Sequence, residues 1–117
     1  MSPPISIVSI IGETCITIED GNRIYSAIHP LLFNNKDVTL DFNGVKIFAS
    51  PFFNAAIGQL LRDITITHIH THLQIVCLSA NGEHIFNRVI ENAQRYYTNS
   101  NFRDSVEKVL AQQTIDL

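Results

Sequence analysis

The sequence contains no tryptophan, one methionine and two cysteines, and only 16% of its residues are charged. Lysine and arginine together number 8 and are scattered, which argues against a nucleic-acid partner. No apolar run approaches the roughly 20 residues that span a bilayer, which argues against a membrane protein. The first residues, MSPPISIVSI, lack a basic start and a cleavage site, so we expect no signal peptide and a cytoplasmic location.

The cysteines are too few to suggest a disulfide framework. Cys15 lies in the run TCITI and Cys77 in the run IVCLS, and both runs are apolar and strand-like. A buried, reduced thiol is the usual state at such positions. We therefore expect both thiols to be buried.

The chain does contain a large apolar fraction, 45% of its 117 residues, with a formal net charge of -3. This composition is typical of a compact globular protein. The length fits one domain and is sufficient for a core without disulfides or bound metal. We expect a single domain over residues 1–117.

Apolar patterning in the first half of the chain predicts three strands and a helix. Residues 5–11 and 14–18 are rich in isoleucine and read as short strands that can form a hairpin. A helix is expected to start at Asp20 as its cap, and Pro30 ends or kinks it. Residues 38–42 alternate apolar and polar side chains, as a half-buried strand does, and the chain runs on extended after the turn at 43–44.

In the second half, Ser50 and Pro51 open a helix with its core stripe at Phe53, Ile57, Leu60, Leu61 and Ile64. Residues 73–79 are apolar enough for a strand covered on both faces. A loop at 80–84 precedes a helix from Ile85, and a C-terminal helix is expected at about 101–113.

This alternation predicts an α/β fold with a mixed, mostly parallel sheet of about four to five strands, packed with helices. The predicted sheet core consists of Ile7, Leu40, Phe42, Ile75 and Cys77.

Three stretches carry a family resemblance: VTLDFNGVKIFASPFFNAAIGQLL, LQIVCLS and VIENAQRYY. Together they resemble the STAS-like family of bacterial domains of unknown function. The resemblance covers roughly residues 5 to 98. It implies a STAS-like fold and, by similarity to anti-sigma-factor antagonists, a protein-binding role without enzymatic activity.

In those antagonists, a serine at the start of the helix after the central strand is phosphorylated by a histidine-kinase-like ATPase, and phosphorylation releases the partner. The resemblance places Ser50 at that position. The antagonists usually have Asp-Ser-Ser-Gly there, whereas this chain has Ala49-Ser50-Pro51-Phe52.

Two interpretations of Ser50 remain open. A serine N-cap stabilises a helix by about 1 kcal/mol, and proline suits the first helical position. A phosphate on Ser50 would instead act as a switch. We expect partner contact at Ser50, Phe52, Asn54 and Gly58, since the outward arc of this helix is small and partly apolar. The alternative is that another part of the same domain covers the arc.

The run THIHTHLQ places His68, His70 and His72 on one face, if it forms a strand. Zinc takes four ligands, and the remaining ones are not evident near this run. We therefore expect a polar, exposed connector without cofactor or metal, and keep the three histidines as weak metal candidates.

These observations predict a protein–protein interaction module, in an anti-sigma-antagonist-like switch with an ATPase or kinase as its partner. One alternative is a small metal-dependent enzyme that uses His68, His70 and His72. The other is a structural module that self-associates, for example as a homodimer.

Overall fold

The structure is a computed structural model, and it describes residues 3–98. The C-terminal helix expected at 101–113 lies outside the described residues. In chain order the elements are β1 (Ile5–Ser6), α1 (Ile7–Ile11), β2 (Thr14–Cys15), α2 (Ile18–Phe33), β3 (Val38–Asp41), β4 (Ile47–Phe48), α3 (Ser50–Ala56), the 3-10 helix η1 (Gly58–Arg62), α4 (Ile66–His72), β5 (Leu73–Val76) and α5 (Ala80–Thr98).

The described strands form two parallel sheets. One has three strands in the order β1-β3-β5, and the other pairs β2 with β4. Ile5 lies beside Leu40 in the first sheet, and Thr14 lies beside Ile47 in the second. The chain is thus an α/β domain with a parallel arrangement of strands, as the sequence predicts.

The predicted hairpin between residues 5–11 and 14–18 is wrong, because β1 and β2 belong to different sheets. The first run leaves the strand after two residues. Ser6 caps α1, and its side chain accepts a hydrogen bond from the backbone N–H of Ser9 at 3.3 Å. A side-chain cap of this kind favours helix over strand locally.

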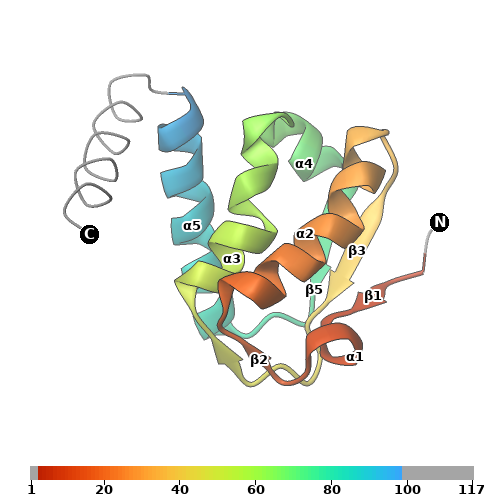
Figure 1. The fold of residues 1–117 in the computed structure, drawn as a ribbon, viewed down its shortest axis with the longest axis vertical. Helices are drawn as coiled ribbons and strands as arrows, with labels where there is room; N and C mark the ends of the chain where they lie inside the picture. Colours follow the sequence, from red (N-terminus) through yellow and green to blue (C-terminus); the bar gives the residue numbers. More distant parts are fainter. Residues whose placement is uncertain (1–2, 99–117) are drawn as a thin grey trace.

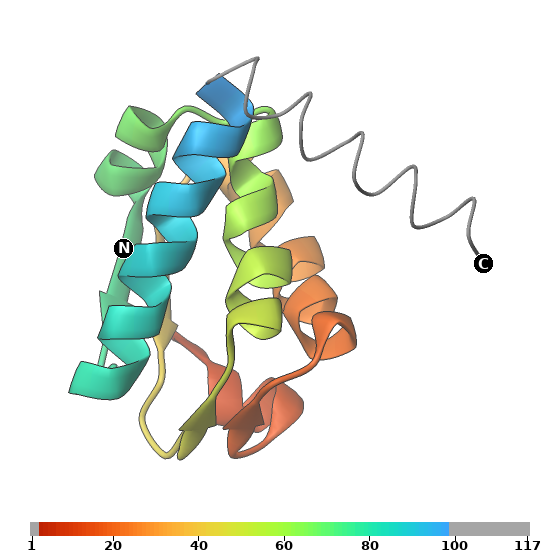
Figure 2. The same ribbon diagram turned by 90° about the vertical axis from the view of Figure 1, so that its left-hand side faces the viewer.

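Helices α2, α3 and α5 lie side by side as one layer, with α3 between the other two (Figures 1 and 2). In β3, Val38 and Leu40 are buried, whereas Thr39 and Asp41 on the opposite face are partly exposed. No residue of β5 is fully buried, so the expected coverage on both faces is wrong. The strand lies at the edge of its sheet, which leaves one side unpaired.

Aromatic rings join the two sheets to the helix layer. The ring of Phe53 in α3 lies 5.9 Å from that of Phe42, 5.8 Å from Phe48 and 5.7 Å from Phe86, between ring centroids. Phe42 follows β3, Phe48 belongs to β4 and Phe86 belongs to α5. One hydrophobic core therefore serves both sheets.

The predicted core is right for Ile7, Leu40 and Phe42, which are buried. Ile75 is partly buried. Cys77 is exposed, so that prediction is wrong. Its φ of 60° ends the extended conformation of β5 and takes its side chain out of the strand pattern.

Several helix ends also differ from the prediction. Thr17, rather than Asp20, caps α2, with its hydroxyl accepting from the N–H of Asp20 at 3.1 Å. Pro30 lies inside α2, which continues to Phe33. Residues 80–84, expected as a loop, form the first turn of α5, and the Ser79 hydroxyl accepts from the N–H of Gly82 at 3.1 Å.

Candidate functional site

Ser50 is the first helical residue of α3, directly after the two-residue strand β4 and Ala49. Ala49 occupies the N-cap position, and no side chain caps the helix. The expected capping role of Ser50 is therefore wrong, because a cap must precede the first helical residue. Pro51 takes the second helical position. A backbone N–H at that position has no acceptor within the helix, so a proline, which lacks the N–H, is tolerated there.

Ser50, Pro51 and Asn54 are exposed. Within residues 3–98, the Ser50 hydroxyl makes no hydrogen bond. The helix start thus presents a free hydroxyl group to solvent, with an amide side chain one turn further along the same face.

Part of the expected outward arc of this helix faces the interior of the domain. Phe52 is fully buried, Ala55 is 5% exposed, and Gly58 is buried at the start of η1. The predicted contact set is therefore split: Ser50 and Asn54 are accessible, whereas Phe52 and Gly58 are not. Helices α2 and α5 of the same domain cover this part of the arc, as the alternative interpretation expects.

Gly21 in α2, which the sequence analysis did not single out, allows the backbones of α2 and α3 to pack closely against each other. A Cβ atom at Gly21 would lie 2.5 Å from the Phe52 carbonyl oxygen and 2.6 Å from the Ala55 Cβ. By contrast, a Cβ at Gly58 would make only ordinary contacts, at 3.6 Å or more. The closely packed backbones in this region are those of α2 and α3, and Gly21 is the residue that permits their contact.

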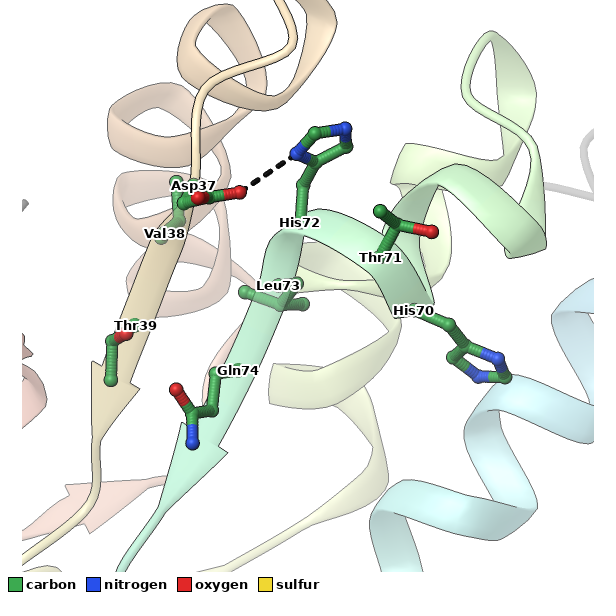
Figure 3. Close-up of a pocket in the computed structure, with 8 residues that line it drawn as sticks. All are labelled: Asp37, Val38, Thr39, His70, Thr71, His72, Leu73 and Gln74. Carbon is green, nitrogen blue, oxygen red and sulfur yellow. Dashed lines mark hydrogen bonds and ion pairs between the residues drawn. The ribbon is translucent and has the colours of Figure 1, made fainter. Parts of the chain in front are cut away.

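The histidine run forms a helix, α4, and not an extended strand. Thr65 caps it, and its hydroxyl accepts from the N–H of His68 at 3.2 Å. His68 and His72 are one turn apart, with ring centroids separated by 4.4 Å. His70 points away from His72 and Asp37 (Figure 3). The expected shared face of three histidines is therefore wrong.

His72 and Asp37 lie at one end of a polar pocket of about 350 Å³ (Figure 3). His72 Nδ1 lies 2.8 Å from a carboxylate oxygen of Asp37. The pocket is also lined by Val38, Thr39, His70, Thr71, Leu73 and Gln74. Among residues 3–98, no group of three or more histidine, cysteine or acidic side chains could hold a metal ion.

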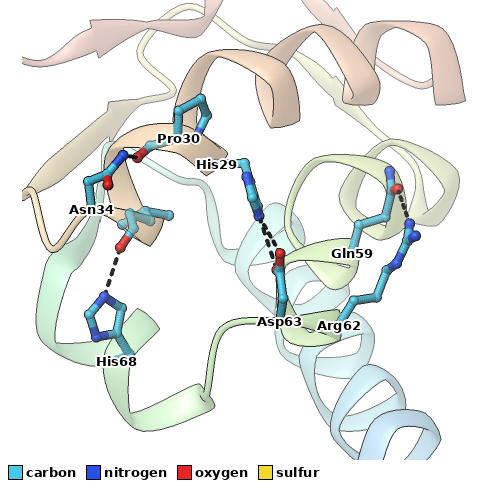
Figure 4. Close-up of polar contacts among 8 residues, drawn as sticks. His29, Pro30, Asn34, Gln59, Arg62, Asp63 and His68 are labelled. Atoms are coloured by element: carbon cyan, nitrogen blue, oxygen red, sulfur yellow. Dashed lines mark hydrogen bonds and ion pairs between the residues drawn. The ribbon is translucent and has the colours of Figure 1, made fainter.

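His29 and His68 connect α2 to the segment that follows α3 (Figure 4). His29 Nε2 lies 2.9 Å from Asp63 Oδ2, and the His29 ring stacks on Phe33 with centroids 5.6 Å apart. His68 Nε2 donates to the Leu32 carbonyl oxygen at 2.8 Å. No sequence signal links His29 with Asp63, which are 34 residues apart. Together with the Asp37–His72 pair, these contacts indicate a structural role for His29, His68 and His72.

The two thiols differ in accessibility. Cys15 is buried, and burial, reinforced by the nearby Asp20 carboxylate, raises its pKa to about 12. Cys77 is exposed, yet desolvation and then the charge and hydrogen bond of Asp41 raise its pKa. Both groups are therefore held as neutral thiols at pH 7, which argues against a nucleophilic thiolate.

The comparisons with known proteins gave one match. The family model described as "STAS-like domain of unknown function (DUF4325)" matches residues 20–83, which is more than half of the chain. This match spans most of α2, all of the elements from β3 to β5, and the first residues of α5. The search of curated proteins gave no match, and neither did the search of solved structures. In the described part of the chain, no helix combines the length and apolar character needed to cross a membrane.

Proposed function

Because the chain belongs to the family of STAS-like domains of unknown function, we propose that it is a cytoplasmic protein-interaction module with a regulatory role. The observation that carries the proposal is the exposed, unbonded hydroxyl of Ser50 at the start of α3. No structural role accounts for this hydroxyl, because it neither caps the helix nor makes a hydrogen bond elsewhere in residues 3–98.

In this proposal the partner contacts Ser50, Pro51 and Asn54, the three exposed residues on the first turns of α3. Phe52 lies beneath this surface with its side chain fully buried, and α3 as a whole packs between α2 and α5. The partner therefore meets a rigid helix start, which limits the entropy lost on binding.

Phosphorylation of Ser50 by an ATPase or kinase partner would switch this contact. A phosphate group adds nearly two negative charges and three acceptor oxygens at pH 7. Placed between two docked surfaces, it would oppose binding through its volume and its desolvation cost. The exposed hydroxyl allows this addition without disturbing the core.

The test compares variants of the full chain in a capture experiment from the cytoplasm of the native cells. Wild-type protein, Ser50→Ala and Ser50→Asp are immobilised in parallel, and bound proteins are quantified by mass spectrometry. Ser26→Asp is the matched control, because Ser26 is an exposed serine on α2 and lies outside the proposed contact. Mass spectrometry of the protein from native cells looks for a phosphorylated Ser50 peptide.

We expect Ser50→Asp to capture at least about tenfold less partner than the wild-type protein, which corresponds to about 1.4 kcal/mol of binding free energy. Ser50→Ala and Ser26→Asp should capture as much partner as the wild-type protein does. Equal capture by Ser50→Asp and Ser50→Ala would show that Ser50 is not a switch. Unchanged capture by an Asn54→Ala, Pro51→Ala double variant would show that the contact lies elsewhere.

A further inference from the structure

A pocket of about 280 Å³ lies where the C-terminal end of α5 meets η1 and the start of α4. Figures 1 and 2 show this end of α5 beside the chain that links α3 to α4. The surface of the pocket is mostly apolar. Leu61, Ile66 and Tyr97 line it and are only partly buried, so they would gain from being covered. We call this site the apolar pocket.

The size and chemistry of the apolar pocket favour an apolar protein side chain over a small molecule. Small-molecule sites usually measure roughly 300–1,000 Å³ and hold their ligand with several precisely placed polar groups. The apolar pocket is smaller than this range. Its charged residues already have partners, because Asp63 pairs with His29 at 2.9 Å and Arg62 donates to the Gln59 side chain at 3.3 Å.

The chain itself supplies an apolar side chain close to the pocket. Tyr97 lines the pocket, and the described part of the chain ends one residue later, at Thr98. The first apolar residue after Thr98 is Phe102. Five residues of extended chain span at most about 18 Å, so Phe102 can lie no further than this from Tyr97. The residues between them include Asn99, Ser100 and Asn101, which favour a turn.

The sequence beyond Phe102 has the pattern of a helix with one apolar face. Val106, Val109 and Leu110 follow Phe102 at intervals of four, seven and eight residues. A helix of this length has little stability by itself and depends on packing of its apolar face. The pattern therefore calls for a surface to cover, and the apolar pocket is the nearest one along the chain.

We propose that the segment 99–117 docks on its own domain, with the side chain of Phe102 in the apolar pocket. A second copy of the chain could offer the same segment. The short connection, however, gives the chain's own segment an effective concentration of about 1 mM, so it occupies the pocket first. The pocket lies beyond the C-terminal end of α3, whereas Ser50 lies at its start, so this proposal does not depend on the Ser50 contact.

The absence of tryptophan from the sequence allows a test with a single introduced fluorophore in the untagged full chain. We expect Phe102→Trp to emit at a shorter wavelength in buffer than in urea, and to be quenched less by acrylamide, because the docked ring is shielded from water. Ala111→Trp is the control. Position 111 is nine residues after Phe102, on the opposite face of a helix, and its tryptophan should stay exposed.

A second substitution in the Phe102→Trp protein tests the pocket itself. Ile66→Asp should move the emission to the longer wavelength of an exposed tryptophan, because burying a carboxylate beside the ring is costly. Ile66 is the first residue of α4, where an acidic side chain is favourable, so this variant should fold. Thr67→Asp is the matched control, at an exposed residue in the same turn and outside the pocket.

Circular dichroism checks that each variant is folded. If Ile66→Asp does not fold, Ile66→Thr replaces it, since threonine keeps the β-branched shape. An introduced tryptophan at position 102 that is as exposed in buffer as in urea overturns the proposal. Equal emission in the variants with Ile66→Asp and Thr67→Asp overturns it as well. Emission that shifts only as the protein concentration rises from about 1 µM to about 100 µM would identify a second copy as the occupant and also overturn it.

Discussion

At the start of α3, the side chain of Ser50 is not needed for the fold, so substitutions of Ser50 can test function without changing the stability of the protein. Ala49 is the N-cap, and Ser50 makes no capping hydrogen bond. Ser50→Ala should change the free energy of unfolding by less than about 0.5 kcal/mol, as exposed substitutions do. Urea denaturation measures it. A loss of about 1 kcal/mol or more would show that the hydroxyl caps α3 in solution.

The reactivity of Cys77 tests its contact with Asp41. Desolvation and then the Asp41 carboxylate raise the thiol pKa, and a raised pKa leaves less thiolate at a given pH. Asp41→Asn should remove the carboxylate part of the shift, speed alkylation by iodoacetamide at pH 8 and move the pH–rate profile to lower pH.

Two controls accompany this measurement. Asp37→Asn changes a carboxylate beside the other end of β3 and should leave the rate unchanged. Cys77→Ser should abolish alkylation of the native protein, because Cys15 is 0% exposed. An unchanged rate in Asp41→Asn would mean that the carboxylate does not act on the thiol.

Among the secondary-structure elements, the contact between α2 and α3 depends on one glycine. Gly21→Ala should destabilise the protein by about 1–3 kcal/mol, because the added methyl group would overlap backbone atoms of α3. Gly58→Ala is the matched substitution, where the methyl group meets only ordinary contacts. It should be neutral or stabilising by up to about 1 kcal/mol. Thermal unfolding of both variants gives the comparison, and equal losses would contradict this account of helix packing.

Local sequence patterns predict the secondary-structure elements better than they predict which elements contact each other. The apolar residues of the strand at 38–42 and of the helix from Ser50 repeat with a clear period, which predicts both elements. The helix at Ile66–His72 is not among the predicted elements, although the cap residue Thr65 and the spacing of Ile66 and Ile69 indicate a helix.

Other features are decided by long-range contacts that one sequence does not reveal. The histidine pairs with Asp63 and Asp37 join segments 34 and 35 residues apart. The burial of Phe52 and Gly58 depends on the neighbouring helices, so half of the expected contact set was misplaced. The family match supports the fold class, whereas the role of Ser50 and Asn54 stays a prediction.

For the whole molecule, Phe53 connects the two sheets through one core. Its ring contacts Phe42, Phe48, Phe52 and Phe86. Phe53→Ala should cost about 3–5 kcal/mol, a large part of the stability of a small domain. Urea unfolding followed by both fluorescence and circular dichroism should still show one transition, since no separate core remains for either sheet.

The control for this prediction is Phe33→Ala, at a phenylalanine that is 56% exposed. It should cost less than about 1 kcal/mol. A Phe53→Ala variant that loses one sheet and keeps the other, seen as two separate transitions, would contradict the single core.

The parallel pairing of all the described strands has a consequence for how the chain folds. Ile5 pairs with Leu40, Thr14 with Ile47 and Val38 with Leu73, so each strand meets a partner 33 to 35 residues away. Contacts this distant slow folding, because a long loop must close before the contact can form. During synthesis, β1 and β2 must wait unpaired until β3 and β4 have left the ribosome. Over that interval α2, with its own cap at Thr17, is the longest element able to form from local contacts alone.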